Sequence, residues 1–558
     1  MKAAELLIKT LEDAGVKTVF GYPGGAILPF YDALYDSNLE HILVRNEQGA
    51  ALAADGYARA SGEIGVCVAT SGPGATNLVT GIANAYLDSV PMLAITGQVP
   101  SPMIGTDAFQ EVDIVGITMP IVKHSYRVLD AEKVEQTVKE ALHLAQSGRP
   151  GPVLLDIPKD VLNTEVTVLK GKEVTYSQPE TTSLDAVNAA LDLLASAKRP
   201  LVYGGGGIAL AKVTREFQDF VEALQCPTVL TLKGLGALPS AHDLFLGMLG
   251  MHGLKTANYA VQNCDLLICI GARFDDRVTG LLEEFAPEAR VVHLDVDPAE
   301  VGKRRHPDVA VIGSLKKHLT LLTEQSRELK VEPWRQQCLR HKAENYWRYD
   351  PPNDFVYAPR LIRDISLTET KETFVTCDVG QHQMWVAQHY LFKRPENHLT
   401  SGGLGTMGYG LPAAIGATLA RPDAHVINIT GDGSFMMNVQ ELATIKRYNL
   451  PVKVVVLDNQ CLGMVRQWQE LFLEERYSET DLSDNPDFVK LAKGFGLPAF
   501  RVEETSQVDE AIHRIHHDEG PLLIHVVLDK VANVWPFVPP GKSNSVMWEE
   551  NPNERTQS

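Results

Sequence analysis

The stretch from residue 425 to residue 459, HVINITGDGSFMMNVQELATIKRYNLPVKVVVLDN, constrains the fold more than any other part of the chain. Residues 425–430 are short, apolar and β-branched, which predicts a buried strand. The glycines at 431 and 433 permit a sharp turn. Apolar residues then recur at helical spacing until Pro451, and residues 451–457 predict a second buried strand. The stretch therefore predicts a βαβ unit with two parallel strands.

Two polar residues directly follow these predicted strands. Asp432 and Asn459 stand at carboxyl ends of strands, where open α/β sheets bind ligands. Asp432 also opens a helix, whose N-terminus favours anions. A carboxylate and an amide oxygen suit Mg²⁺, which takes its remaining ligands from phosphate and water. The stretch thus indicates a magnesium-diphosphate site, although a plain turn followed by a loop explains the same spacing equally well.

Length and composition describe a multidomain globular chain. Its 558 residues suggest about three or four domains. Acidic residues outnumber Lys and Arg by 70 to 51, which disfavours a nucleic-acid-binding role. The seven cysteines form no CxxC motif, so we expect a reducing compartment without a disulfide framework or zinc site. No apolar run could cross a bilayer, and residues 1–15 predict an amphipathic helix, without the features of a signal or transit peptide. We therefore expect a cytoplasmic protein without a membrane role.

Strands and helices alternate in three blocks of the sequence. We expect domains at residues 1–165, 183–325 and 355–530, separated by polar segments at 163–182 and 326–354. Residues 531–558 are rich in Pro, Asn and Glu and predict an ordered tail with a frayed end. The fold class expected is three doubly wound, mostly parallel α/β domains. The first and third blocks share this design and are candidates for related halves, although no clear sequence repeat links them.

Several distinctive loops lie at predicted strand ends, and each has an ordinary explanation beside a functional one. Glu47, in RNEQGAALAADGYAR, opens a helix, where a carboxylate commonly only complements the helix dipole. TSGPGATN at 70–77 either cradles a ligand or makes a tight turn. GGGGIA at 204–209 fits the dinucleotide fingerprint loosely, and GMLGMHG, GARFDDRVTG and DVDPAE in the same block favour a large nucleotide. Met464 and Trp468 lie one helical turn apart, which core packing also explains.

Taken together, these motifs resemble those of one family. GDG with DN downstream, RNEQGA and TSGPG are similar to motifs of the thiamine-diphosphate-dependent enzymes of the pyruvate oxidase and decarboxylase group. Within that group, TGQVP, IGTDAFQE, GARFDDRVTG, GQHQMW and MVRQWQ resemble the acetohydroxyacid synthase (acetolactate synthase) catalytic subunits, bacterial isozyme II type. The resemblance extends from the N-terminus through the Pro-rich tail. It implies a pyrimidine-binding first domain, a central FAD-binding domain and a diphosphate-binding third domain.

The resemblance also implies a reaction and its cofactors. Thiamine diphosphate and Mg²⁺ would support decarboxylation of pyruvate, and the remaining two-carbon unit would join a second pyruvate or 2-oxobutyrate. The products, 2-acetolactate and 2-aceto-2-hydroxybutyrate, belong to valine, leucine and isoleucine biosynthesis. FAD would be structural.

Particular roles follow from the same resemblance. Asp432, Asn459 and the Cys461 carbonyl would bind Mg²⁺. Glu47 would hydrogen-bond the aminopyrimidine, Met407 would bend the cofactor and the Gly408 backbone would bind its pyrimidine. Arg277 would receive the carboxylate of the second substrate, and Trp468 would favour a substrate with an added methylene. Gln110, Phe109 and Lys159 would line the access channel. The full set of expected cofactor contacts is Pro23, Gly24, Glu47, Pro73, Asn77, Gly204, Gly205, Gly206, Met251, His252, Gly271, Arg273, Asp275, Arg277, Asp295, Asp297, Gln381, His382, Met407, Gly408, Gly431, Asp432, Gly433, Ser434, Asn459 and Met464.

The family further implies a homodimer or a dimer of dimers with active sites between chains, and a separate small regulatory subunit. Two other functions remain open, that of a pyruvate oxidase and that of a non-enzymatic scaffold. A pyruvate oxidase would share the scaffold and use FAD for redox chemistry, but the motifs containing Arg277 and Trp468 argue against it. A non-enzymatic scaffold is disfavoured because Glu47, Asp432 and Asn459 are all present. A glyoxylate-joining relative is disfavoured because that group lacks the glutamate.

Overall fold

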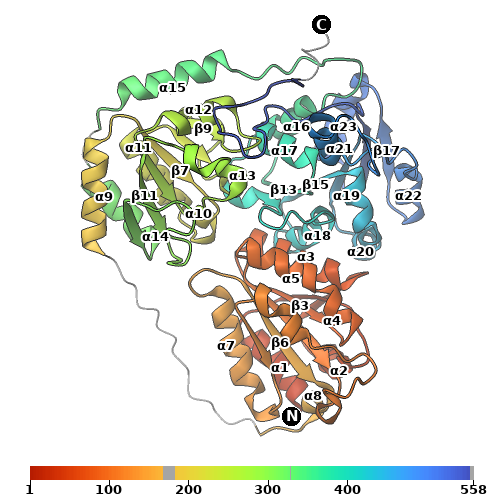
Figure 1. The fold of residues 1–558 in the computed structure, drawn as a ribbon. Helices are drawn as coiled ribbons and strands as arrows, with labels where there is room; N and C mark the ends of the chain where they lie inside the picture. The colour runs from red at the N-terminus through yellow and green to blue at the C-terminus, as the bar shows by residue number, and fades with distance from the viewer. Residues whose placement is uncertain (168–182, 327–328, 553–558) are drawn as a thin grey trace.

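The part of the chain that the structure describes contains three parallel sheets of six strands each, arranged as Figure 1 shows. The computed structural model describes residues 1–167, 183–326 and 329–552. The expected linker at 163–182 and the expected frayed end therefore lie mostly outside the described residues. Nearly every central strand residue is buried, as expected where helices cover both faces of a parallel sheet. The expectation of three α/β domains with parallel sheets is confirmed.

The first sheet has the strand order β2-β1-β3-β4-β6-β5. Its strands are β1 (Thr18–Gly21), β2 (Glu40–Leu43), β3 (Gly65–Ala69), β4 (Met92–Gln98), β5 (His124–Arg127) and β6 (Pro152–Pro158). Its helices are α1 (Ala3–Asp13), α2 (Leu28–Tyr35), α3 (Glu47–Ser61), α4 (Pro73–Asn77), α5 (Val79–Leu87), α6 (Ile114–Thr118), α7 (Val134–Gln146) and α8 (Lys159–Asn163). The expected first helix is thus present as α1, and α3 begins at Glu47.

The third sheet repeats this topology, with the order β14-β13-β15-β16-β18-β17. Its strands are β13 (Thr373–Cys377), β14 (His398–Thr400), β15 (His425–Gly431), β16 (Lys453–Asp458), β17 (Ala499–Val502) and β18 (Leu522–Val527). Its helices are α16 (Ala358–Leu367), α17 (Gln381–His389), α18 (Gly410–Ala420), α19 (Asp432–Met437), α20 (Leu442–Tyr448), α21 (Gly463–Phe472), α22 (Phe488–Gly494) and α23 (Val508–His517). The first and third domains are therefore related in topology, although their sequences show no clear repeat.

The central sheet is wound differently. Its strands are β7 (Pro200–Gly204), β8 (Thr228–Leu230), β9 (Phe245–Met248), β10 (Leu266–Ile270), β11 (Arg290–Asp295) and β12 (Val309–Ile312). Its helices are α9 (Leu184–Ser196), α10 (Gly207–Leu210), α11 (Thr214–Leu224), α12 (Lys255–Asn263), α13 (Asp276–Thr279) and α14 (Leu315–Gln325), and α15 (Glu332–Glu344) follows. The order β9-β8-β7-β10-β11-β12 is the 3-2-1-4-5-6 order of dinucleotide-binding sheets, with its switch point between β7 and β10.

The stretch 425–459 folds largely as expected, with one difference. β15 and β16 are parallel neighbours, and Asp432 is the first residue of the helix between them. The segment between the strands is, however, broken into α19, a 3-10 turn and α20. The break falls at Asn438, whose side chain donates to the Gly408 carbonyl at 2.7 Å. A tertiary hydrogen bond thus competes with helix continuation, as polar side chains commonly do.

Helices α3 and α18 join the first and third domains within the chain (Figure 1). A Cβ on Gly56 would overlap Ala413, and one on Gly416 would overlap the Ala53 carbonyl, so small residues permit very close packing. The helices run antiparallel, because positions later in α3 meet positions earlier in α18. At its other end, α3 is held by Glu441, which accepts from the backbone N–H groups preceding Glu47.

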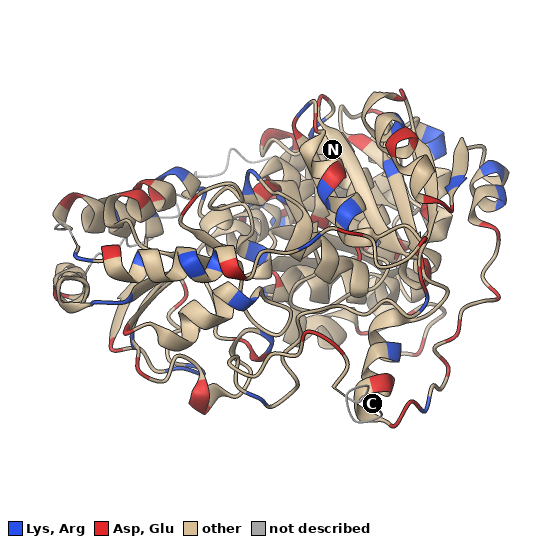
Figure 2. Ribbon diagram, turned by 90° about the horizontal axis from the view of Figure 1, so that it is seen from above, with Lys and Arg blue, Asp and Glu red and all other residues tan. Residues whose placement is uncertain are grey.

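The tail returns over the central and third domains. Phe537 and Trp548 form an antiparallel bridge, and Phe537 packs with Met251 and Leu471. Among residues 1–167, 183–326 and 329–552, no helix is long and apolar enough to cross a membrane. In the view of Figure 2, basic and acidic residues are interspersed along the ribbon.

Candidate active site

The third domain presents a set of polar groups at the carboxyl ends of β13, β15 and β16. Asp432 follows β15 and Asn459 follows β16, and both side chains are buried. Asn459 donates to Gln381 at 2.9 Å, so α17, after β13, joins the same group. A Cβ at Gly431 would lie 2.8 Å from His382 Nδ1. The turn between strand and helix can therefore pack this closely only because glycine occupies it.

Asp432 is a buried carboxyl group beside a second one, that of Asp458. Burial and the neighbouring Asp458 raise the pKa of Asp432 to about 8. Its Oδ2 accepts from Asn485 at 2.9 Å, a loop residue that no sequence motif singles out. Within the described part of the chain, no three His, Cys, Asp or Glu side chains gather as a metal site. Two protein side chains and a carbonyl fit Mg²⁺, which usually keeps water and phosphate ligands.

A second observation fits a diphosphate beside these groups. His382 is buried, its Nε2 has no hydrogen-bond partner, and burial lowers its pKa to about 3. The neutral ring can donate from Nε2 to an anionic oxygen. Ser434 stands in the first turn of α19 and already donates to the Val379 carbonyl at 2.9 Å. The expected residues Gln381, His382, Gly431, Gly433 and Ser434 are therefore gathered at one edge of the third sheet.

Met407 and Gly408 precede α18 on the same domain. Gly408 has a φ of +83°, a conformation that favours glycine. A Cβ on Gly433 would lie 3.7 Å from Met407 Cε, so the Met407 side chain reaches the turn that carries Asp432. The Gly408 carbonyl accepts from Asn438 and retains a second lone pair for a ligand.

The first domain carries the other expected contacts to the thiamine cofactor. Glu47 is buried at the start of α3, and Asn77 donates to its Oε2 at 2.9 Å. Pro73 begins α4, and the following glycine approaches Glu47 Oε1. Gly24 packs so closely on Thr70 that a Cβ would overlap it. These residues thus come from the segments that follow the carboxyl ends of β1, β2 and β3: the loop residues Pro23 and Gly24, and the helix residues Glu47, Pro73 and Asn77.

The expected channel residues lie on a loop and at the start of a helix of this domain. Gln110 has a φ of +61°, and its backbone approaches Gly72. Phe109 is 88% exposed, an unusual position for a phenylalanine. Lys159 is half-buried at the start of α8. Exposed apolar side chains near a binding loop commonly mark a surface that another molecule covers.

A cavity of about 1740 Å³ runs between the three domains. The expected residues that line it are Gly206, Met251, His252, Gly271, Arg273, Asp275, Arg277, Asp295, Met407, Met464 and Trp468. The glycine turn after β7 touches the turn after β10, since a Cβ on Gly205 would lie 2.5 Å from the Gly271 carbonyl. These turns flank the switch point of the central sheet, where dinucleotides bind.

Polar groups around the cavity are compatible with a large ligand. His252 Nδ1 is buried without a partner, and burial followed by the Arg277 charge lowers its pKa to about 3. Asp295 stands at the end of β11, and burial raises its pKa. Asp297 pairs with Arg149 of the first domain at 3.3 Å. Asp275 has less capacity left for a ligand. Its carboxylate caps α13 and already accepts hydrogen bonds from Arg277 N and Val278 N.

Arg277 and Trp468 meet at this cavity although they come from different domains. The guanidinium carbon lies 5.9 Å from the centroid of the Trp468 ring, a cation–π distance. Met464 is on the same face of α21 as Trp468, and both side chains line the cavity. This face is therefore available to a ligand and does not serve core packing alone. A guanidinium cation thus stands beside an aromatic wall of the cavity. Arg277 remains largely exposed and has room to bind a ligand.

The two halves of the expected thiamine site do not meet within one chain. Arg59, late in α3, lies over the Tyr409 ring at 5.6 Å, so the C-terminal part of α3 approaches the start of α18. Glu47 lies at the opposite end of α3. At a rise of about 1.5 Å per helical residue, roughly 20 Å separates Glu47 from Gly408 along the helix axes. One aminopyrimidine ring cannot contact both residues across that distance.

Comparison with known proteins identifies the family. Residues 1–117 match the thiamine pyrophosphate enzyme N-terminal TPP binding domain, residues 187–322 the central domain, and residues 378–526 the C-terminal TPP binding domain. The acetolactate synthase isozyme 2 large subunit of Escherichia coli is 54% identical over 99% of this chain and 100% of that protein. The probable acetolactate synthase large subunit of Methanocaldococcus jannaschii is 48% identical, over 97% of this chain and 94% of that protein. The acetolactate synthase large subunit of Corynebacterium glutamicum is 46% identical, over 98% and 90%. The chain therefore belongs to the thiamine pyrophosphate enzymes and, within them, to the acetolactate synthase large subunits.

Proposed function

We propose that this chain is the catalytic subunit of an acetolactate synthase. It decarboxylates pyruvate and joins the remaining two-carbon unit to a second pyruvate or to 2-oxobutyrate. The observation that carries the proposal is the Arg277–Trp468 pair at the cavity. A cation beside an apolar wall suits a 2-oxo acid acceptor, whose carboxylate and alkyl chain need opposite environments.

Thiamine diphosphate, Mg²⁺ and FAD are the cofactors that this function requires. Asp432, Asn459 and the Cys461 carbonyl would hold Mg²⁺, and the neutral His382 would donate to the diphosphate. When bound, thiamine diphosphate supplies the electron sink that decarboxylation of a 2-oxo acid needs. The glycine turns after β7 and β10 would hold FAD, which needs no redox role in this reaction.

Glu47 would act on the aminopyrimidine ring. Its burial keeps water away, and Asn77 fixes the carboxylate through Oε2. The other oxygen, Oε1, stays available to hold a proton at a ring nitrogen, where a positioned carboxyl group is an efficient acid or base. Gln110, Phe109 and Lys159 would form the entry to the site.

We infer that a complete site needs two copies of the chain. The first domain of one copy would bring Glu47 to the Met407 and Asp432 region of the other. Both surfaces expose apolar side chains suited to such an interface. The exposed set includes Met103, Phe109, Ile117 and Met119 on the first domain and Met436, Met437 and Val465 on the third. A two-fold dimer would then contain two equivalent sites.

Further assignments follow from the family. The relatives are called large subunits, so we propose a separate small regulatory subunit as partner. A cytoplasmic location is proposed on the biosynthetic role of such enzymes and on the cysteines, which are all buried and free. We propose three domains and a tail, at residues 1–165, 183–325, 355–530 and 531–558. The positions of the three sheets support these limits.

Product analysis tests the function directly. Purified protein is supplied with thiamine diphosphate, Mg²⁺ and pyruvate, with and without 2-oxobutyrate and FAD, while CO₂ and products are quantified. We expect one acetolactate per CO₂ released, and 2-aceto-2-hydroxybutyrate when 2-oxobutyrate is added. Bleaching of bound flavin by pyruvate under anoxia, with no acetolactate, would instead establish a pyruvate oxidase. Absence of CO₂ release with all cofactors present would indicate a non-enzymatic role.

A further inference from the structure

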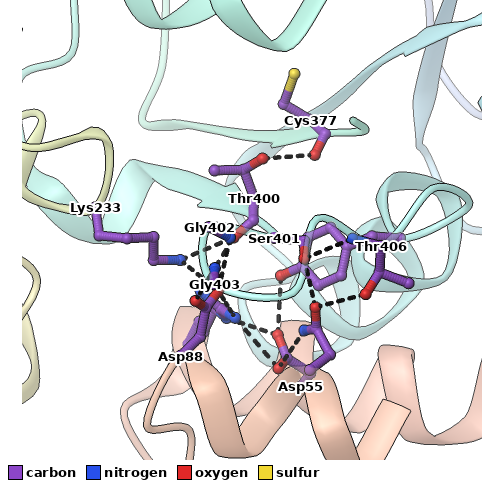
Figure 3. Close-up of polar contacts among 12 residues, drawn as sticks. Asp55, Asp88, Lys233, Cys377, Thr400, Ser401, Gly402, Gly403 and Thr406 are labelled. Atoms are coloured by element: carbon purple, nitrogen blue, oxygen red, sulfur yellow. Dashed lines mark hydrogen bonds and ion pairs between the residues drawn. The ribbon is translucent and has the colours of Figure 1, made fainter. Parts of the chain in front are cut away.

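Lys233 stands where the three domains meet (Figure 3). It belongs to a 3-10 turn of the central domain, Leu232–Gly234. Its Nζ donates to the Thr400 carbonyl of the third domain at 2.8 Å and lies 3.3 Å from Asp88 Oδ2 of the first domain. One side chain therefore contacts both of the other domains.

Asp88 binds the loop that follows β14 as a buried anion. Its two oxygens accept from the backbone N–H groups of Gly402 at 3.0 Å and Gly403 at 2.7 Å (Figure 3). Successive backbone N–H groups that converge in this way form an anion-binding nest. Arg59 donates to the same carboxylate at 2.8 Å and also to Asp55. The two carboxylates are thus balanced by two cations, Arg59 and Lys233.

The bound loop leads directly to the residues proposed for the thiamine site. A hydrogen bond closes the loop 401–406, because Thr406 N donates to Ser401 Oγ at 2.9 Å. Both residues donate to Asn84 Oδ1, at 2.6 and 3.0 Å (Figure 3). Met407 and Gly408 follow without an intervening residue. These hydrogen bonds connect the Gly402 end of the loop to Thr406, the residue directly before Met407.

The stem of Lys233 is also packed against the proposed FAD site. A Cβ on Gly206 would lie 3.0 Å from Lys233 Cβ, and one on Gly402 would lie 2.7 Å from Lys233 Cδ. The lysine stem is therefore enclosed between the glycine turn after β7 and the loop after β14. Gly234, its neighbour, lies close to the Gly204 carbonyl of the same turn. The glycine turn after β7 therefore packs directly against Lys233 and its neighbour.

We propose that Lys233 is a positioning residue that couples FAD binding in the central domain to thiamine diphosphate binding in the third domain. The coupling rests on the proposed function for the identity of the two ligands. Bound FAD would hold the Gly204–Gly206 turn, which packs on Lys233. Lys233 and Asp88 in turn hold the loop that leads to Met407 and Gly408. A structural flavin thereby contributes to the thiamine site without redox chemistry. Because coupling is reciprocal, thiamine diphosphate strengthens FAD binding by the same factor.

Calorimetric titration tests this coupling without turnover. The dissociation constant of thiamine diphosphate is measured in excess Mg²⁺ on full-length protein, first without FAD and then with saturating FAD. For the wild type we expect binding to tighten about tenfold with FAD, within the usual range of allosteric coupling. For Lys233→Met, which keeps the stem and removes the charge, we expect this ratio to fall to about one. Lys233→Arg should restore most of it.

Lys342→Met is the matched control. Lys342 is also half-buried, and its Nζ donates to the Phe245 carbonyl at 2.7 Å, away from the junction. We expect its ratio to stay at the wild-type value. A wild-type ratio of one, an unchanged ratio in Lys233→Met, or equal losses in both methionine variants would each overturn the proposal. Product analysis separates this result from the proposed function, because a wild type that makes no acetolactate can still show the binding ratio.

Discussion

The separation of Glu47 from Gly408 leads to a quantitative prediction about mixed dimers. If each site combines the first domain of one chain with the third domain of its partner, Glu47→Ala and Asp432→Ala should complement each other. Each pure dimer has two broken sites. A mixed dimer has one site that carries both substitutions and one that carries neither, by two-fold symmetry. The roughly 20 Å between Glu47 and Gly408 along α3 and α18 favours this arrangement over a site within one chain.

The expected magnitude follows from counting sites. Random association of equal amounts makes about half of the dimers mixed, each with one of two sites intact, so activity should reach about a quarter of wild type. The two variants are co-expressed with different tags, the mixed species is isolated, and CO₂ release is measured. The isolated mixed dimer should have about half of wild-type activity. This calculation assumes independent sites.

A double variant supplies the decisive control. A chain carrying both Glu47→Ala and Asp432→Ala, paired with a wild-type chain, breaks both sites of an interchain dimer. If sites form within one chain, the same pair keeps one intact site. An inactive dimer of the two single variants, together with about half of the activity in the wild type paired with the double variant, would show that each site forms within one chain.

Four further predictions address single residues. Trp468→Leu should still form acetolactate but lose about tenfold of any preference for 2-oxobutyrate, since a methylene contact supplies about 1–3 kcal/mol; an unchanged product ratio in direct competition would contradict this role. Arg277→Lys should lower acetolactate formed per CO₂ released, because lysine lacks the planar fork; an unchanged yield would count against it. The raised pKa of Asp432 means that the cofactor-free folded protein keeps a proton that the unfolded chain has lost, so unfolding free energy should fall as pH rises from about 4 to 8. Asp432→Asn should flatten that fall in thermal unfolding measured from pH 5 to 9, and an identical slope in both proteins would refute the assignment. Gly416→Ala should destabilise the protein by about 1–3 kcal/mol, because its Cβ would overlap the Ala53 carbonyl; unchanged denaturant unfolding would show that the α3–α18 contact can relax.

Much of the local structure of this protein is determined by short stretches of its sequence. The βαβ unit at 425–459 follows from two apolar β-branched runs, a glycine turn and a proline stop, each of which acts over a few residues. The same patterns placed Asp432, Asn459, Glu47 and Gly206 at strand ends, where parallel sheets bind ligands. These features can be predicted from the sequence because the backbone conformation at each of them depends on residues that are near in the chain.

Tertiary structure decided what depends on contacts between distant segments. The sequence could not show that Asn438 interrupts the helix after β15, because its partner, the Gly408 carbonyl, lies 30 residues away. Nor could it show the strand order of the central sheet or the meeting of Arg277 with Trp468 across two domains. The antiparallel packing of α3 on α18, which separates Glu47 from Gly408, depends on glycines that fit only against one particular partner. Lys233 belongs to no recognised motif, and its place between three domains arises only when the chain has folded, because a lysine acquires such partners from the packing around it.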